Sequence, residues 1–172
     1  SFIYAKQNTM INVRFGIGKK KYLSEKAKRR GLAVGYTYEI GPSLAILKPY
    51  YLELQYNTIG ENNIPVTELV EEKYTGDNEA KFLNHNGNDI FGASSYFKGL
   101  DEVFFRVGAQ GKMGAHFALG AFDKYVRAIE TGVMIDVFPR KIPILVETED
   151  YKNQNVFLRL YLSIQLGWRK NA

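Results

Sequence analysis

The stretch VFFRVGAQGKMGAHFALGA, residues 103–121, alternates between two kinds of side chain. Its odd positions are mostly large and apolar, as at Val107 and Phe117, whereas its even positions are polar or small, as at Arg106 and His116. A period of two residues indicates a β-strand, because successive side chains of a strand point to opposite faces. The alternation is much longer than the roughly five or six residues of an ordinary strand in a soluble domain. It suits a tilted strand that crosses a bilayer in about 9 to 11 residues and continues beyond it.

The same alternation recurs elsewhere in the chain and predicts six antiparallel strands in all. The other five strands are expected over residues 11–18, 33–46, 51–56, 125–138 and 156–168.

The predicted connections alternate in length. Short turns are expected at 48–50 and 122–124, and long connections at 19–31, 57–102 and 139–154. Short turns on one side and long loops on the other are typical of bacterial outer-membrane barrels, in which the short turns face the periplasm. With six strands, this rule predicts that both chain ends lie on the periplasmic side.

The composition excludes several other classes of protein. The chain has 172 residues, of which 45% are hydrophobic and 24% charged, so neither a multidomain enzyme nor a disordered protein is expected. It has no cysteine, which excludes a disulfide framework and a cysteine nucleophile, and only two histidines, which disfavours the common zinc centres. No stretch approaches the roughly 18 to 20 uncharged apolar residues of a membrane-spanning helix.

These observations predict an all-β fold, namely a membrane-spanning antiparallel up-and-down β-barrel. We expect a single barrel domain over residues 1–172 with a long surface loop at 57–102. Because the smallest bacterial barrels have eight strands, about eight are expected in the full protein. An upstream hairpin, together with a signal peptide, would complete the barrel before Ser1. Alternatively, Ser1 to Lys6 and part of the long loop supply the missing strands.

A soluble barrel of the lipocalin kind is the structural alternative, because its strands also alternate. Such a barrel points its apolar face inward around a ligand. The minority face of the predicted strands is crowded with Gly, Ala and Ser, which suits the cramped interior of a narrow membrane barrel. Aromatic residues near the predicted strand ends are expected to form the interfacial girdles of a membrane barrel, among them Tyr22, Phe138 and Trp168.

Several short motifs follow one another along most of the chain. They are Tyr4-Ala5-Lys6-Gln7-Asn8, Gly16-Ile17-Gly18, Gly41-Pro42-Ser43-Leu44, Leu47 to Glu53, Phe97 to Glu102, Lys141-Ile142-Pro143-Ile144 and Leu160-Tyr161-Leu162-Ser163. In this order they resemble a family of uncharacterised outer-membrane β-barrel proteins of Bacteroidota. The resemblance implies a signal peptide and further N-terminal sequence, and it implies no catalytic residues. The family often has Pro-Gly where Arg106-Val107-Gly108 stands here, a departure that leaves the expected fold unchanged.

The predicted barrel interior holds four cations, four carboxylates and one histidine. These lumen residues are Arg14, Arg106, Lys112 and Arg159, then Glu39, Glu53, Glu130 and Asp136, and finally His116. An unpaired charge in a narrow barrel costs several kcal/mol, so the equal numbers predict a network of ion pairs that plugs the lumen. A proton or ion path through the same charges is the functional alternative.

The sequence predicts no enzyme, no cofactor and no metal site. The alternative is a lipid-modifying outer-membrane enzyme that uses His85 or His116, with Asp89, Ser94 and Ser95 in the same long loop as His85. Asn84 to Asp89 also offers oxygen ligands for Ca²⁺ but lacks the regular acidic spacing of a calcium loop. A turn-rich loop whose polar side chains bond to their own backbone is the simpler interpretation.

The net charge of +5 is unevenly distributed. Residues 57–102 are acidic, whereas the connection after residue 18 is basic, through Lys19, Lys20, Lys21, Lys26, Lys28, Arg29 and Arg30. Lipopolysaccharide phosphates or the acidic loop are the expected contacts of these cations, a merely solvated loop is the equal alternative, and no nucleic acid is expected. The sequence therefore predicts a structural or accessory protein of the bacterial outer membrane. Because long loops in compact domains are usually functional or disordered, we expect it to be a subunit of a larger outer-membrane assembly.

Overall fold

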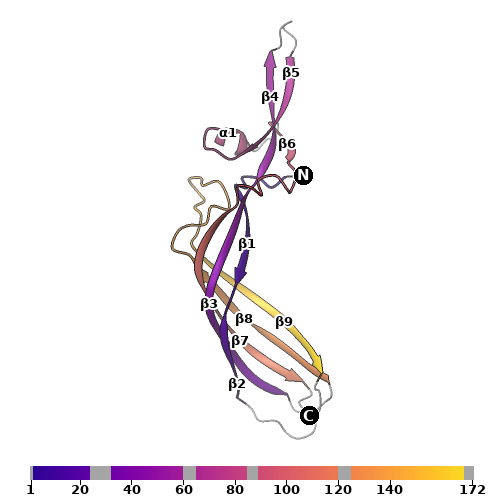
Figure 1. Ribbon diagram of the computed structural model, residues 1–172, viewed down its shortest axis with the longest axis vertical. Coiled ribbons are helices and arrows are strands. Elements are labelled where there is room, and N and C mark those ends of the chain that lie inside the picture. Colours follow the sequence, from indigo (N-terminus) through magenta and orange to yellow (C-terminus); the bar gives the residue numbers. More distant parts are fainter. Residues whose placement is uncertain (1, 24–31, 60–64, 85–88, 120–124, 169–172) are drawn as a thin grey trace. The chain divides into compact units, whose positions relative to one another are not determined.

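The computed structural model describes residues 2–23, 32–59, 65–84, 89–119 and 125–168. Within these residues the protein is all-β and antiparallel, as predicted, apart from one short helix (Figure 1). The strands are β1 (Asn8–Arg14), β2 (Ile17–Tyr22), β3 (Ala33–Pro49), β4 (Tyr51–Ile59), β5 (Pro65–Lys73), β6 (Ile90–Ala93), β7 (Phe104–Leu119), β8 (Tyr125–Val137) and β9 (Val156–Trp168). The helix is α1 (Glu79–Phe82). No helix in the described residues is both long and apolar enough to span a bilayer.

The larger sheet has six strands and is strongly curled. Its order is β1-β3-β7-β8-β9, and β2 also pairs with β3. β1 and β2 therefore act as one strand that is interrupted at Phe15 and Gly16. At this interruption the Phe15 N–H donates to the Pro42 carbonyl oxygen at 3.1 Å. Gly41 lies opposite, where a β-carbon would collide with the Phe15 carbonyl oxygen, so the close approach requires glycine.

The smaller sheet has three strands in the order β5-β4-β6. Alternate residues of β4 face its core, where Leu52 and Leu54 are fully buried together with Phe82 of α1 and Ile90 of β6. Burial of these side chains on one face is what makes a short three-stranded sheet stable.

The described residues group into two compact units. The first, here called the β4–β6 unit, comprises residues 1–12, 45–106 and 140–154. The second, here called the curled unit, comprises residues 13–44, 107–139 and 155–172. Chain order connects them repeatedly, because the chain leaves the curled unit after Leu44, returns at Val107, leaves again after Pro139 and returns at Asn155. The single domain predicted over 1–172 stays a prediction.

One part of the predicted topology is wrong. Residues 51–56 fall in β4, which pairs with β5 and β6 and not with β3. Lys48-Pro49-Tyr50 is consequently no hairpin turn, since β3 ends at Pro49 and β4 begins at Tyr51. On the side away from β1 and β2, β3 is followed in the curled sheet by β7. Residues 57–102, predicted as a loop, contain β5, α1 and β6.

The curled sheet therefore has five passes in the described residues and not six, if β1 and β2 count as one. With an odd number of antiparallel passes, β1 begins at one end of the sheet and β9 finishes at the other. Tyr22 pairs with Gly35, Leu119 pairs with Arg127, and Tyr125 pairs with Trp168 at that second end. The prediction that the first strand begins and the last strand finishes at the same end of the sheet is wrong for this reason.

Candidate functional site in the polar interior of the curled sheet

The curled sheet has an apolar outer face and a polar inner face. On β9 the even-numbered side chains point outward, and Leu160 is 84% exposed and Leu162 70% exposed. On the inner face of neighbouring β8, Glu130 is 3% exposed and Asp136 is fully buried. The alternation in sequence produces both faces, because each strand of the sheet contributes side chains to each face in turn. The candidate site is the set of charged side chains that this curl encloses.

Asp136 is the centre of the first charged cluster. Its carboxylate accepts two hydrogen bonds from Arg14 of β1, at 2.8 and 2.7 Å. The Ser43 hydroxyl donates to the same carboxylate at 3.0 Å. The guanidinium of Arg159 on β9 lies 3.5 Å away. This carboxylate is therefore held by two cations and a hydroxyl, which is the condition for burying a charge without a large penalty.

Glu130 is the centre of the second charged cluster. The Lys112 ammonium lies 3.1 Å from one carboxylate oxygen, and the Tyr161 hydroxyl donates to the same oxygen at 2.9 Å. Nδ1 of His116 lies 3.6 Å from the other oxygen. His116 is 2% exposed, and the ring of Tyr22 packs edge-on against it at 5.8 Å between centroids. Lys112, Tyr161 and His116 thus surround one carboxylate.

Lys20 joins this second cluster from the opposite edge of the sheet. Its Nζ lies 3.4 Å from Nε2 of His116, 3.4 Å from the Gln165 side-chain oxygen and 4.0 Å from Glu130. β2 and β9 are thus bridged by side chains, although the described residues include no backbone pairing between these two strands. A cavity of about 320 Å³ lies beside this bridge, and Lys20, Lys112 and Gln165 contribute to its lining.

Small residues make room for the enclosed side chains. Gly114 of β7 pairs with Gly132 of β8, which in turn pairs with Tyr161 of β9. The Tyr161 hydroxyl occupies the place where a β-carbon of Gly114 would lie. The missing side chains at this pair of glycines therefore allow Tyr161 to reach Glu130 across the sheet.

The structure places all but one of the predicted lumen residues on strands of the curled sheet, and Glu53 is the exception. Glu39 accepts a hydrogen bond from Gln110 at 3.0 Å on the inner face. Glu53, by contrast, lies on β4 in the three-stranded sheet. Arg106 lies near the start of β7, where its guanidinium is 5.7 Å from the Phe104 ring centroid. The departure of Glu53 follows from the insertion of β4 to β6 between β3 and β7.

The cations predicted to contact lipopolysaccharide divide into three groups. Lys20 faces the interior, whereas Lys19 and Lys21 lie on β2 among exposed residues. Lys26, Lys28, Arg29 and Arg30 lie outside the described residues. Alternation along the strand explains why Lys20 differs from Lys19 and Lys21. Lys20 lies on the same face as Arg14, whereas Lys19 and Lys21 lie on the opposite face.

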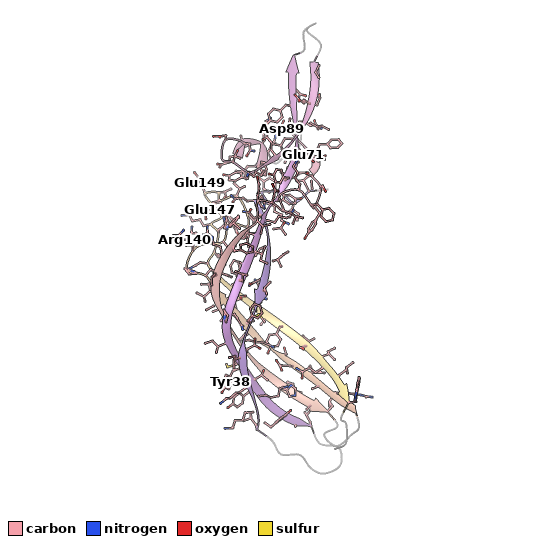
Figure 2. All side chains as sticks on the ribbon, viewed as in Figure 1. Tyr38, Glu71, Asp89, Arg140, Glu147 and Glu149 are labelled. Carbon is pink, nitrogen blue, oxygen red and sulfur yellow. The ribbon has the colours of Figure 1, made fainter. Side chains whose placement is uncertain are left out.

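The structure describes some of the residues of the enzyme alternative. His85 lies outside the described residues. Asp89 accepts a hydrogen bond from Asn84 at 2.6 Å, and the Ser94 hydroxyl donates to Glu71 at 2.6 Å; Asp89 and Glu71 are labelled in Figure 2. Among the described residues, no three His, Asp or Glu side chains gather as a metal site would require.

One aromatic residue predicted for an interfacial girdle lies elsewhere. Phe138 is only 1% exposed, and its ring packs against the ring of Phe157.

The interior cluster includes residues that the predicted lumen set omitted. They are Lys20, Ser43, Gln110, Tyr161 and Gln165. The alternation already places Ser43, Gln110, Tyr161 and Gln165 on the minority face, so that pattern was sufficient to find them. Lys20 was missed because the predicted first strand ended two residues before it.

No protein-family model, curated protein or solved structure matches this chain.

Proposed function

We propose that the curled sheet spans the outer membrane of a bacterium as part of a β-barrel with a plugged polar interior. In this proposal the protein is a structural or accessory component, and it acts as a subunit of a larger outer-membrane assembly. The observation that carries the proposal is the reversed polarity of the curled sheet, with fully buried Asp136 inside and Leu162 70% exposed outside. The resemblance to the Bacteroidota barrel family supports the same location.

The outer face of β9 gives the strongest support for a membrane-spanning sheet. Its exposed apolar side chains are Val156, Leu158, Leu160, Leu162, Ile164, Leu166 and Trp168. Leaving a large apolar side chain in water forgoes about 1.5 to 3 kcal/mol, so such a row in a stable protein requires an apolar environment. Hydrocarbon chains of lipids provide one, and outward apolar residues are the pattern of membrane barrels. A lipocalin-like barrel would need the opposite polarity.

The paired interior favours an accessory role over a conducting pore. Asp136 and Glu130 are each bound by at least two cations, and their side chains are at most 4% exposed. Ion conduction needs polar groups that an ion can bind and leave in turn, whereas these carboxylates are already engaged by protein cations. The enzyme alternative also gains no support from His116, because a ring that is 2% exposed and covered by Tyr22 is enclosed.

The position of β2 refines the expected lipid contact. β2 finishes at the same end of the sheet as β9. Tyr22 pairs with Gly35 near the start of β3, where Ala33 packs with Ala118 of β7 and Ala128 of β8, and Ala128 pairs with Gln165 near the end of β9. If the last strand descends to the periplasm, as in other barrels, Lys19 and Lys21 face the periplasmic leaflet. Phospholipid phosphates are then a better partner for these two lysines than lipopolysaccharide, at about 1 kcal/mol per lysine.

Trp168 offers a direct test, because it is the only tryptophan of the chain and is 80% exposed. The full protein should be recovered in the outer-membrane fraction and resist carbonate extraction. After reconstitution, lipids brominated on their acyl chains should quench Trp168 fluorescence. Recovery in the soluble fraction, together with no quenching, would contradict the membrane proposal.

The plugged interior and the accessory role need separate measurements. Purified wild-type protein should give no steady ion current in planar bilayers, and such a current would favour the pore alternative. Mild-detergent purification from the native cell should recover the protein with stoichiometric partners. Recovery as a single species, together with altered lipid A when the gene is deleted, would favour the enzyme alternative.

A further inference from the structure

A separate pocket of about 260 Å³ lies within the β4–β6 unit. Its wall is built from the N-terminal segment, the junction of β3 with β4, and the segment that begins at the end of β6. The lining residues are Lys6, Thr9, Lys48, Tyr50, Tyr51, Ala93, Ser94, Ser95 and Tyr96. This lining combines two lysines with hydroxyl groups and aromatic rings, and it includes no Asp or Glu.

Lys48 is a buried cation in this wall, with only 7% of its surface exposed. Its ammonium donates to the carbonyl oxygens of Tyr96 at 2.6 Å and Lys98 at 3.0 Å. An ammonium has three donors, so these two bonds leave one more for a ligand. The ammonium also lies 4.8 Å from the ring centroid of Tyr96.

Lys6 brings a second positive charge to the same pocket. Its ammonium lies 4.8 Å from the ring centroid of Tyr50. Burial, and then repulsion from Lys6, lower the pKa of Lys48 below its ordinary value. Two like charges beside one cavity are unfavourable unless a negative group enters between them.

Two carboxylates near this pocket, Glu71 and Glu102, are bound to other partners. Glu71 is bound to Lys98 at 2.7 Å and to Ser94 at 2.6 Å. Glu102 is bound to Lys73 at 2.9 Å and to the Tyr51 hydroxyl at 2.9 Å. Lys48 instead has two neutral carbonyl partners and, within the described residues, no ion pair, so its buried charge lacks a compensating anion there.

We propose that this pocket binds the phosphate group of a small ligand, or of a lipid, between Lys6 and Lys48. Lysine binds phosphate as a compact point charge, and the hydroxyls of Thr9 and Ser95 add uncharged donors. The volume is slightly below the range of about 300 to 1,000 Å³ typical of drug-sized ligands, which suits a phosphate with one small ring. The Tyr50 and Tyr96 rings supply apolar walls for such a ring.

The pocket is organised before any ligand binds. The two bonds from Lys48 to the carbonyl oxygens of Tyr96 and Lys98 hold the turn that carries Ser95 and Tyr96. The Tyr50 N–H donates to the Gln7 carbonyl oxygen at 3.0 Å and fixes the opposite wall. A preformed wall reduces the ordering cost of binding.

Titration calorimetry on the full protein in mild detergent at low salt tests the proposal. The probes are inorganic phosphate, glucose 6-phosphate and glucose, followed by vesicles with and without lipid A. We expect saturable binding of a phosphate-bearing probe and none of glucose. Binding in solution identifies a free phosphate ligand, whereas binding of lipid A vesicles alone identifies a lipid phosphate, and either result supports the site.

Two variants and a control locate the binding. Lys6→Met should weaken binding about tenfold or more, because it removes one charged contact. Lys48→Met should weaken binding by a similar factor. If the loss of buried Lys48 disturbs folding, Lys6→Met alone still tests the site. Lys81→Met is the matched control, since Lys81 lies over the Tyr56 ring and outside this lining. Absence of binding by every phosphate probe, or wild-type binding by folded Lys6→Met, would overturn the proposal.

Discussion

Arg14 and Asp136 form a two-pronged ion pair across the interior of the curled sheet. Nε and Nη2 of Arg14 donate to Oδ1 and Oδ2 of Asp136 at 2.8 and 2.7 Å, although 122 residues separate them in sequence. Arg14 ends β1 and Asp136 lies in β8, and β3 and β7 lie between these two strands in the sheet. The pair can form only because the sheet curls. The free energy of unfolding lost when the pair is broken therefore tests the curl.

Arg14→Met should destabilise the protein by about 3 to 5 kcal/mol, because it leaves a fully buried carboxylate with a weaker set of partners. Arg159→Met is the matched control. The Arg159 side chain is 39% exposed and lies 3.5 Å from the same carboxylate, so its loss should cost about 1 kcal/mol or less. Urea unfolding in detergent, followed by Trp168 fluorescence, measures both. Equal costs for the two variants would contradict the assigned geometry.

Leu162→Arg tests the outer face of β9. If that face meets hydrocarbon near the bilayer midplane, the substitution should cost about 2 to 4 kcal/mol when the protein folds into lipid vesicles. Leu69→Arg on β5 is the control, since Leu69 is 50% exposed but lies outside the curled sheet. Comparable, small costs for the two variants would argue that the outer face of β9 does not contact lipid.

Gly114→Ala tests the crowded interior of the curled sheet. The added methyl group would displace the Tyr161 hydroxyl from Glu130, so we expect a loss of about 1 to 3 kcal/mol. Gly111→Ala on the same strand provides the comparison, because its β-carbon would meet Ile135 at an ordinary 3.5 Å. The two unfolding free energies should differ clearly, and a harmless Gly114→Ala would show that Tyr161 packs differently.

The β4–β6 unit should lose stability in acid through Glu102. Hydrogen bonds from Lys73 and then Tyr51 hold the pKa of Glu102 below its ordinary value. Its stabilising contribution is therefore complete above the ordinary glutamate pKa, about 4.3, and is lost as the pH falls through the lowered value. Near-ultraviolet circular dichroism of the tyrosines follows this loss. Glu102→Gln should show a shallower acid dependence, and an unchanged profile would exclude this role.

The alternation in sequence determined the fold class and the two faces of the long strands. A strand turns its side chains to opposite faces with a period of two, so Leu162 and Glu130 were assigned to their faces without knowledge of any partner strand. The same local rule determined that Gln110 and His116 face the interior. Nothing in this inference required contacts between distant residues.

Only the tertiary structure decided which strands pair and which charges meet. Lys48-Pro49-Tyr50 has the composition of a turn, yet the chain continues there from β3 into β4, and β3 pairs with β7 instead. Strand pairing depends on packing between segments far apart in sequence, for which a local pattern holds no information. The contact of Lys20 with Gln165, from opposite edges of the sheet, and the enclosure of Lys48 beside Lys6 arise for the same reason. They depend on curvature and chain convergence, which are properties of the assembled strands and not of any single one.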